Sequence, residues 1–548
     1  MTNAEIAGHF NLLAQLMELH DENAFKIRSY QFAYRTLKNF GTPLIEMKEP
    51  EIKNIQGIGD AISKKIIDLI QTGKLDLLEK YLAITPPGVV EMLAIKGIGP
   101  KKIQQLWKEL DIETLGELYY ACIENRITLL KGFGEKTQES LIQSIEFMLQ
   151  NARKFLWARL EPAAEKMMEV FKTKFKDDDW QFVGQYNRKM AVVESLDFIT
   201  TADKTSVTSF LNEGTFKTEF QSKYLSFSSP SGLNGKIYFT TAKQMGSLAF
   251  SLNCSEAFYK AFSELYNIEA AENEQQVFES AHFPYLAPEI RDSTQAIKLA
   301  VENKLNELVT EADILGVVHS HTKWSDGGNT IEEMANYCQT LGYHYLVITD
   351  HSKSAFYANG LSGARIQQQH EEIDRINDNM TSFKIFKGIE ADILNDGQLD
   401  YGDDILKTFD CIIASVHANL KMSEEKSMQR LIKAIENPYT NILGHMTGRL
   451  LLSRKGYPVD HKKIIDACAQ NGVSIELNAN PHRLDIDATW LEYCMEKGVL
   501  ISINPDAHNL RGVHDIRYGV IQARKGLLTK EFLLNGKTTS VFKECLKK

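Results

Sequence analysis

The C-terminal part of the sequence carries histidine and carboxylate side chains at intervals, each beside a short apolar run. Six of the 14 histidines belong to this set. Imidazoles combined with a few carboxylates are typical of sites for zinc, iron or manganese, whereas magnesium and calcium prefer oxygen ligands alone. The candidate ligands are His319, His321, Asp326, His351, Glu390, His417, His445, Asp506 and His508. Nine donors are too many for one ion, so we expect two or three divalent ions that share Glu390 or Asp506 as a bridge.

Such a cluster is suited to the hydrolysis of a phosphate ester. Bound ions lower the pKa of water towards neutrality and neutralise charge on the phosphoryl oxygens. The residues that we expect to be catalytic are Glu390, Asp506, His319 and His321. Arg483 is a candidate for binding the substrate phosphate, and His482 is either a second phosphate contact or an exposed loop residue. Asp350 is either a ligand or a group that orients the neighbouring ligand His351.

The elements that must position these side chains follow from the pattern of apolar runs. From about residue 314, strand-like runs alternate with helical stretches, as in ILGVV, YHYLVI, FKIFKGI, DCIIASV, TNILG, VSIELN and VLISIN. The C-terminal strand ends of a parallel barrel meet at one face, which would gather residues that are remote in sequence. Seven strand and helix pairs therefore predict a closed or nearly closed (β/α)7 barrel over residues 311–548.

A second pattern, in the N-terminal region, is a glycine-x-glycine turn that recurs three times between amphipathic helices. Its glycines are Gly57 and Gly59, Gly97 and Gly99, and Gly132 and Gly134, and lysines that follow the turns include Lys65, Lys101 and Lys136. Glycine permits a tight turn and lets backbone N–H groups reach a phosphate at the next helix N-terminus. A single such turn is more often a plain helix connection, but three with lysines predict contact with DNA. The formal net charge of −10 means that this contact depends on local geometry.

The bulk properties indicate several domains. A chain of 548 residues with 43% hydrophobic content exceeds what one core normally holds. We expect an all-α region divided into domains 1–82 and 83–150, an α+β region over 151–290, a linker over 291–310, and the barrel domain over 311–548. The seven cysteines are scattered, and the sequence shows no leader and no long apolar run. The expected location is the cytoplasm, with no membrane contact, and the oligomeric state stays open.

The motifs HSH, SDG, ITDHS, GIEAD, SVH, GH and DAH, in this order, resemble the PHP (polymerase and histidinol phosphatase) domain, and the glycine turns resemble helix-hairpin-helix motifs. Along the whole chain, the sequence resembles bacterial family X DNA polymerases, in which 83–150 would be a fingers-like domain and 151–290 the palm and thumb. The resemblance implies that the nine candidate positions form the full trinuclear ligand set. It favours manganese, with zinc or iron as alternatives.

The polymerase core departs from this family. The family's palm begins with a Gly-Ser pair and an Asp-x-Asp motif that binds two magnesium ions. Here Gly184 is followed by Gln185, the carboxylate pair becomes Ser195 and Asp197, and Lys236 takes the expected place of the third carboxylate. Phosphoryl transfer depends on metal positioning, so we expect a degenerate core without polymerase activity.

The function expected from these features is that of a metal-dependent DNA end-processing nuclease. It would be a 3′-5′ exonuclease or 3′-phosphodiesterase that acts in DNA repair on 3′ ends of gapped or single-stranded DNA. One alternative is a small-molecule phosphomonoesterase of the histidinol-phosphatase type, whose metal site would look the same. A second is an active family X DNA polymerase. A third, a DNA-binding scaffold with structural metals, would need an incomplete site, which the nine donors disfavour.

Overall fold

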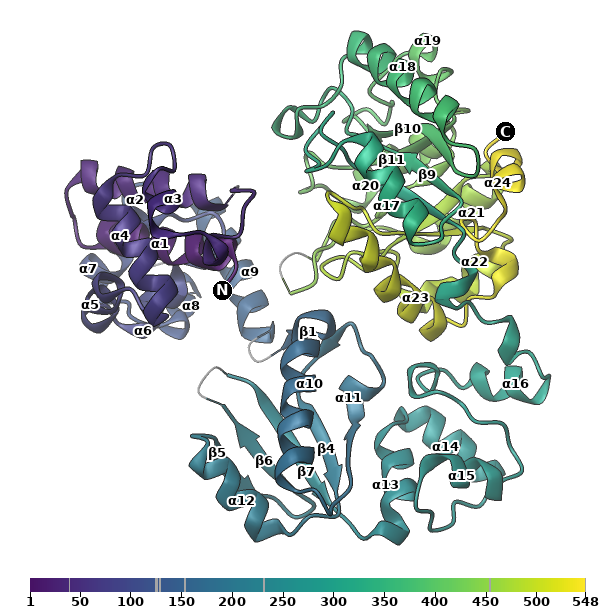
Figure 1. Ribbon diagram of the computed structural model, residues 1–548, viewed down its shortest axis with the longest axis horizontal. Helices are drawn as coiled ribbons and strands as arrows, with labels where there is room; N and C mark the ends of the chain where they lie inside the picture. The colour runs from purple at the N-terminus through teal and green to yellow at the C-terminus, as the bar shows by residue number, and fades with distance from the viewer. Residues whose placement is uncertain are drawn as a thin grey trace. The chain divides into compact units, whose positions relative to one another are not determined.

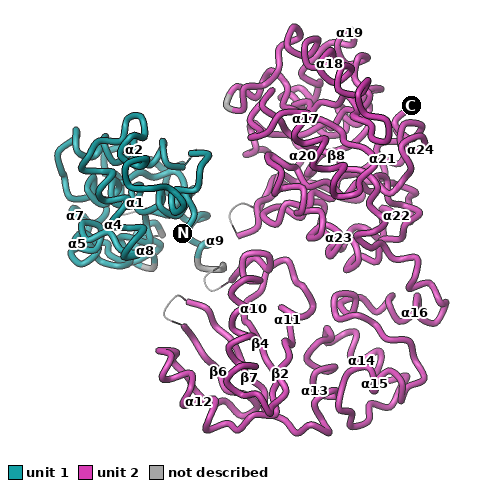
Figure 2. The backbone as a smooth tube through the Cα atoms, viewed as in Figure 1, with its two compact units in different colours: residues 1–152 teal, residues 153–548 magenta. Residues whose placement is uncertain are grey.

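The structure is a computed structural model in which residues 1–38, 40–123, 127, 130–151, 154–229, 232–452 and 455–547 are described. The chain forms two compact units, residues 1–152 and 153–548 (Figures 1 and 2). The predicted domains 1–82 and 83–150 lie in unit 1. The predicted palm and thumb region, the linker and the barrel domain lie in unit 2, apart from the first two residues of the palm region. The predicted boundaries within each unit stay predictions.

Unit 1 is helical throughout its regular elements. Its α-helices are α1 (Asn3–Leu19), α2 (Ala24–Lys38), α3 (Glu49–Lys53), α4 (Asp60–Thr72), α5 (Asp76–Ile84), α6 (Pro87–Met92), α7 (Pro100–Leu110), α8 (Leu115–Ile123) and α9 (Glu135–Asn151). Helix α7 shows why they pack: Ile103, Leu106 and Trp107 fall on one face at helical spacing and are buried. The apolar residues inside the glycine turns, Ile58 and Phe133 among them, enter the same core.

The first part of unit 2 is a five-stranded sheet in the order β2-β4-β7-β6-β5. Its strands are β2 (Trp180–Val183), β4 (Leu196–Thr200), β5 (Lys217–Phe220), β6 (Tyr224–Ser228) and β7 (Asn234–Phe239). Helices α10 (Trp157–Lys174), α11 (Gly184–Asn187) and α12 (Lys204–Glu213) accompany the sheet, and β1 (Phe155–Leu156) pairs with β3 (Val192–Val193). Phe171 of α10 stacks on Trp180 at 4.3 Å between ring centroids, which fixes the helix against the sheet.

Helices then lead from this sheet to the barrel: α13 (Met245–Leu252), α14 (Glu256–Leu265), α15 (Glu274–Ser280) and α16 (Gln295–Val301). The guanidinium of Arg291 is fully buried beside them and pairs with Glu274. Buried charge is tolerated only when it is paired, so this ion pair defines how the connecting segment folds.

The remainder of unit 2 is a parallel barrel. Its strands are β8 (Gly316–Ser320), β9 (Tyr345–Ile348), β10 (Lys384–Asp392), β11 (Cys411–Ser415), β12 (Ile442–Leu443), β13 (Ser474–Asn478) and β14 (Ile501–Asn504), hydrogen-bonded in sequence order. The helices are α17 (Ile331–Thr340), α18 (Gly363–Asn379), α19 (Asp403–Leu406), α20 (Glu424–Ile435), α21 (His461–Asn471), α22 (Leu491–Glu496), α23 (Ile516–Lys525) and α24 (Thr539–Cys545).

The barrel is nearly closed, as the sequence predicted. Ser320 at the end of β8 forms a parallel bridge with Ala507, just beyond β14. The amide of Asn535 spans the seam by donating to the carbonyls of Gly316 and Ile503, at 3.2 and 2.7 Å. First and last strands are thus joined through a side chain and a bridge rather than a full ladder.

Alternation along the strands separates the two layers of this domain. In β10, Ile389 and Ala391 join the core that faces the outer helices, while Glu390 between them points into the barrel. The part of the barrel interior away from the C-terminal strand ends is apolar and includes Phe386, Ile413 and Phe542 of α24. The candidate ligands lie towards the C-terminal strand ends, beyond this apolar part.

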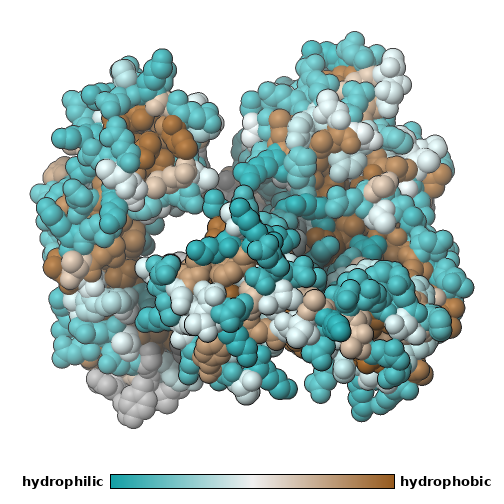
Figure 3. All heavy atoms as spheres, turned by 60° about the horizontal axis from the view of Figure 1, so that its bottom comes forward, coloured by the Kyte–Doolittle hydropathy of each residue, from teal (hydrophilic) through white to brown (hydrophobic). Residues whose placement is uncertain are grey.

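Figure 3 shows a surface that is mostly hydrophilic with scattered hydrophobic patches. Among the residues that the structure describes, no helix is long and apolar enough to cross a membrane.

Candidate metal centre

Two of the predicted ligands lie inside their strands rather than after them, because β8 and β10 extend beyond the C-terminal ends of the apolar runs. His319 is in β8 and Glu390 is in β10. His319 has φ of 68° and Asp506 has φ of 53°, both in the left-handed region that non-glycine residues rarely adopt. Such strain persists where the surrounding structure fixes it, and here it coincides with a register shift in β8.

The structure brings all nine predicted ligands together at the C-terminal strand ends. Eight of them form three overlapping groups whose ligand atoms lie within 4.8 Å of one another: His321, Asp326, His351 and His508; His319, His321 and Asp506; and His351, Glu390 and His417. The ninth, His445, places Nε2 at 3.0 Å from Glu390 Oε1. The donor set is compatible with divalent metal binding.

Orphaned polar atoms in this cluster support that fit. Both ring nitrogens of His321, Nε2 of His319 and Oε2 of Glu390 are buried without a hydrogen-bond partner among the described residues. Buried polar atoms are nearly always satisfied, and each neutral imidazole has one unprotonated nitrogen with a lone pair, so this cluster of unsatisfied imidazole and carboxylate atoms fits bound cations. Burial and the nearby imidazoles of His508 and His351 lower the pKa of His321 to about 3, which keeps its ring neutral and able to coordinate.

Glu390 is the centre of the cluster. Its carboxylate oxygens lie 3.0 to 3.6 Å from ring nitrogens of His319, His321, His351, His417 and His445. Burial alone would raise the pKa of Glu390, but His417 and His319 outweigh it and hold the pKa well below its usual value. The carboxylate is therefore charged and placed to bridge.

Residues that sequence reasoning missed orient the ligands. His319 Nδ1 donates to Glu476 at 2.6 Å, which leaves Nε2 facing the cluster. The amides of Asn478 and Asn504 donate to the same carboxylate at 2.9 and 2.8 Å. Asp392 accepts from His417 Nδ1 at 2.8 Å in the same way. The signal for Glu476 was the alternation of polar residues within the apolar run VSIELN.

Asp350 faces the loop that carries Asp326 rather than the ligand groups. Its carboxylate accepts hydrogen bonds from the backbone and hydroxyl of Thr322, both at 2.7 Å, and from Gln369 at 2.6 Å. It also accepts from the Ser325 hydroxyl at 2.5 Å. These bonds hold the loop that carries Asp326, which differs from the considered role of orienting the neighbouring His351.

Arg483 lies at the edge of the cluster, with Nε 3.6 Å from Asp506 Oδ2. Its neighbour His482 receives a hydrogen bond at 3.1 Å from Arg159 of α10, a residue that sequence reasoning did not single out. The loop after β13 thus connects the metal-ligand cluster with the five-stranded sheet region.

In the five-stranded sheet, Asp197 of β4 is paired in register with Lys236 of β7. The Lys236 ammonium lies 3.9 Å from the Asp197 carboxylate, and Ser195 donates its hydroxyl to the same group. The Gln185 side chain accepts from the backbone of Glu194 at 2.8 Å, and the Glu194 carboxylate pairs with Lys154. The region therefore presents two carboxylates, those of Asp197 and Glu194, and each has a lysine beside it.

The three glycine turns of unit 1 share one geometry. Gly57, Gly97 and Gly132 have φ of 81°, 94° and 88°. Their partners Gly59 and Gly99 are extended N-caps, with φ of −78° and −99°, so only the first glycine of each of these pairs needs a positive angle. Gly134 directly precedes α9.

The lysines of these turns differ in their surroundings. Lys101 and Lys136 are exposed in the first turns of α7 and α9. Lys65 is partly buried, and its ammonium donates to the Ala61 carbonyl at 3.3 Å. Lys102 lies over the Phe133 ring at 5.1 Å, so the second turn contacts the third through it.

The barrel and its strand-end cluster define the class of this chain as a protein with a PHP domain. Residues 318–480 match the family model for the PHP domain. Residues 1–75 match a helix-hairpin-helix domain, and residues 89–146 match a SAM-like helix-hairpin-helix tandem.

Comparison with curated proteins identifies the family within this class of PHP-domain proteins. The chain is 32% identical to the DNA polymerase/3′-5′ exonuclease PolX of Bacillus subtilis (strain 168), and the alignment covers 100% of both chains. The chain therefore belongs to the PolX family of bacterial family X DNA polymerases. Its C-terminal part is also 28% identical to a probable phosphatase of Thermoanaerobacter sp. (strain X514), over 42% of this chain and 95% of that protein.

Proposed function

We propose that this protein is a metal-dependent DNA end-processing nuclease, a 3′-5′ exonuclease or 3′-phosphodiesterase that acts in DNA repair. The observation that carries the proposal is the convergence of nine metal-binding side chains in a chain that also has three glycine turns suited to phosphate. The name of the Bacillus subtilis relative gives both a polymerase and an exonuclease activity for that protein.

The three ligand groups, which overlap at His321 and His351, would hold two or three divalent ions, and Glu390 or Asp506 would be the carboxylate that the ions share. We favour manganese, with zinc or iron as alternatives, because imidazole and carboxylate donors suit all three. When bound, these ions would acidify water and neutralise charge on the scissile phosphate.

The chain's own residues prepare this chemistry. Glu476 and Asp392 hold the tautomers of His319 and His417, so that the other ring nitrogen of each faces the cluster. Arg483 is placed to bind a substrate phosphate beside Asp506. Burial of the ligand shell lowers the local dielectric and strengthens each of these interactions.

We further propose that the polymerase activity is lost. Two magnesium ions need several carboxylates, but the described palm residues around Asp197 present Lys236 and Ser195 instead. Burial raises the pKa of Asp197, against the effects of Ser195 and Lys236, so the charged form of this carboxyl group is less favoured here than in open solvent. The palm would then serve as a support for the nuclease.

The test is product analysis on DNA labelled at the 5′ or the 3′ end, in single-stranded, gapped and abasic forms, with manganese present. The proposal expects stepwise release of nucleotides or blocking groups from 3′ ends. Hydrolysis of histidinol phosphate without cleavage of DNA would favour the small-molecule phosphatase. Template-dependent primer extension would favour the active polymerase.

A further inference from the structure

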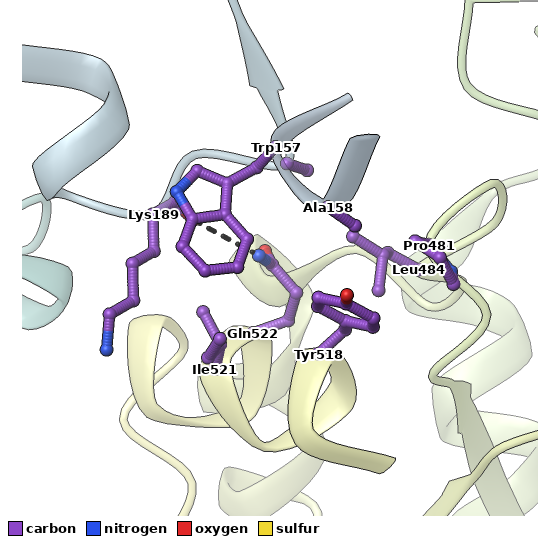
Figure 4. A pocket seen from close by; sticks show the side chains of 9 residues that line it. Trp157, Ala158, Lys189, Pro481, Leu484, Tyr518, Ile521 and Gln522 are labelled. Carbon is purple, nitrogen blue, oxygen red and sulfur yellow. Dashed lines mark hydrogen bonds between the residues drawn. The ribbon is translucent and has the colours of Figure 1, made fainter. Parts of the chain in front are cut away.

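The palm and the barrel meet along a seam beside the metal-ligand cluster. Figure 4 shows Trp157 and Ala158 from the start of α10 facing Tyr518 and Ile521 of α23. The rings of Trp157 and Tyr518 meet edge to face at 6.1 Å. Gln522 donates to the carbonyl of Lys189 at 3.4 Å, the dashed line in Figure 4. These contacts hold the first turn of α10 against the barrel.

Most cations along this seam have carboxylate partners. Arg517 of α23 pairs with Glu161 of α10. Lys525 pairs with Asp292. In addition, Arg524 lies 3.0 Å from Glu289. These pairs join α23 of the barrel to α10 and to the segment around Glu289 and Asp292.

Arg159 differs from them. It is exposed, and no carboxylate lies within 4.0 Å of its guanidinium among the residues that the structure describes. Its Nη2 instead donates to His482 Nε2 at 3.1 Å. Burial and the Arg159 charge lower the pKa of His482, so the ring accepts as a neutral group and does not itself compensate the arginine charge.

The Arg159 guanidinium lies on the side of the palm–barrel interface that leads to the metal-ligand cluster. His482 directly precedes Arg483, whose Nε is 3.6 Å from the predicted ligand Asp506. Burial raises the pKa of Asp515 to about 6, and the guanidinium groups of Arg517, exposed Arg511 and Arg159 act in the opposite direction. Guanidinium groups from the palm and from the barrel therefore converge beside the cluster.

We infer that Arg159 of the palm binds a phosphate of a polynucleotide substrate, next to the scissile phosphate at the barrel's metal centre. The inference rests on the proposed nuclease function and deepens it. A substrate with a single phosphate would occupy the centre and Arg483 alone, whereas a DNA strand has a further phosphate to place against Arg159. Planar guanidinium groups are well suited to paired contacts with phosphate oxygens. On this inference, the degenerate palm is retained because it completes the nuclease's strand-binding surface.

The experiment compares Arg159→Ala, Arg159→Lys and the unsubstituted full chain on two substrates with manganese. One is a 3′-labelled single-stranded oligonucleotide, and the other is bis(p-nitrophenyl) phosphate, which has one phosphate. For Arg159→Ala, the preference for the oligonucleotide, as the ratio of the two kcat/KM values, should fall about tenfold. The change should lie mainly in KM, with Arg159→Lys recovering part of it. The slope of log KM against log salt should become shallower by about 0.7, the value for one phosphate of a single strand.

Lys166→Ala is the matched control, because Lys166 is an exposed cation on the same helix, seven residues and roughly two turns further along. Its substrate preference should equal that of the unsubstituted chain. Glu161→Gln weakens a purely structural pair at the seam and reports, by thermal unfolding, what loss of attachment does.

Two outcomes would overturn the inference alone. One is an unchanged substrate preference in Arg159→Ala while the full chain cleaves DNA. The other is an equal loss on both substrates with a lowered melting temperature, as for Glu161→Gln. If the unsubstituted chain hydrolyses the small ester but no oligonucleotide, the nuclease proposal fails, and the inference fails with it.

Discussion

At the scale of single residues, the cluster depends on carboxylates that touch imidazoles rather than on the imidazoles alone. Glu476 accepts from His319 Nδ1, from the His445 backbone and from two asparagine amides, so all its lone pairs are engaged. A neutral amide in its place would offer one acceptor oxygen and one donor nitrogen. That change would disturb the His319 tautomer without altering the size of the side chain.

Glu476→Gln should therefore weaken metal binding about 10- to 100-fold and reduce hydrolysis, while Glu390→Ala should remove hydrolysis altogether. Metal content after dialysis and the rate on bis(p-nitrophenyl) phosphate give the two measurements. The exposed residue Glu425, in the first turn of α20, provides the control Glu425→Gln. Full activity in Glu390→Ala would refute the ligand assignment.

The nine candidate ligands were accessible from the sequence because each combines a metal-binding side chain with a strand end. The structure brings the nine side chains together, and their role as metal ligands stays a proposal. Glu476, within an apolar run, and Asp392, just beyond one, were missed because a carboxylate at such a place gives no hint of its hydrogen-bond partner. Arg159 was missed for a different reason: its partner His482 is more than 300 residues away, and no local pattern encodes such a contact.

At the scale of elements, the strand and helix alternation predicted the barrel correctly, since apolar periodicity reports directly on burial. Strand ends were less accurate: β10 runs to Asp392, beyond the apolar run, because polar residues extend the ladder inside the barrel. The glycine turns show the same limit. Their spacing predicted the motif, but not that only Gly97 of the second pair would take a positive φ.

Gly97→Val should accordingly raise the Kd for DNA about tenfold, equivalent to about 1.4 kcal/mol. A β-branched residue at φ of 94° forces the turn to change and moves its N–H groups. The measurement is fluorescence anisotropy with a labelled oligonucleotide and metal absent. Gly73→Val is the control, because Gly73 has φ of 72° at the end of α4, away from the turns. Equal effects of both substitutions would mean that unit 1 has merely been destabilised.

The palm sheet gives a prediction of its own. The full chain should extend no primer with any nucleotide, in magnesium or manganese, because Lys236 and Ser195 lie beside the only carboxylate in the described β4–β7 pair. Gel analysis of a labelled primer on a gapped template provides the measurement. Extension that disappears in Asp197→Ala would contradict the loss of polymerase activity.

At the scale of the whole molecule, the two proposed roles, DNA binding and hydrolysis, fall to different compact units. Unit 1 contains the three glycine turns, and unit 2 contains the metal-ligand cluster with the palm attached to it. A cut near residue 308 would be harmful, because Leu308 and Leu527 share a core with the helices before the barrel. The division between residues 152 and 153 leaves both cores intact.

A fragment of residues 153–548 should hydrolyse bis(p-nitrophenyl) phosphate as fast as the full chain and cleave DNA with a much higher KM. Contacts remote from the reacting phosphate act equally in the ground and transition states, so their loss changes binding rather than turnover. Steady-state kinetics on both substrates decide the matter. Equal efficiency on DNA would show that the glycine turns do not serve this reaction.

The junction between the first and last strands of the barrel, β8 and β14, affects the conformational entropy of the unfolded chain. His319 lies in the first strand and His321 directly follows it, while Asp506 and His508 follow the last strand, so an ion shared by them would tie together points about 190 residues apart. Such a cross-link resembles a disulfide that closes a long loop, for which chain-entropy models give about 5 kcal/mol. Removal of metal by chelation should therefore speed amide hydrogen exchange first in β8 and β14, with β11 and β12 exchanging later. The ions would then stabilise the closure of the barrel as well as take part in hydrolysis.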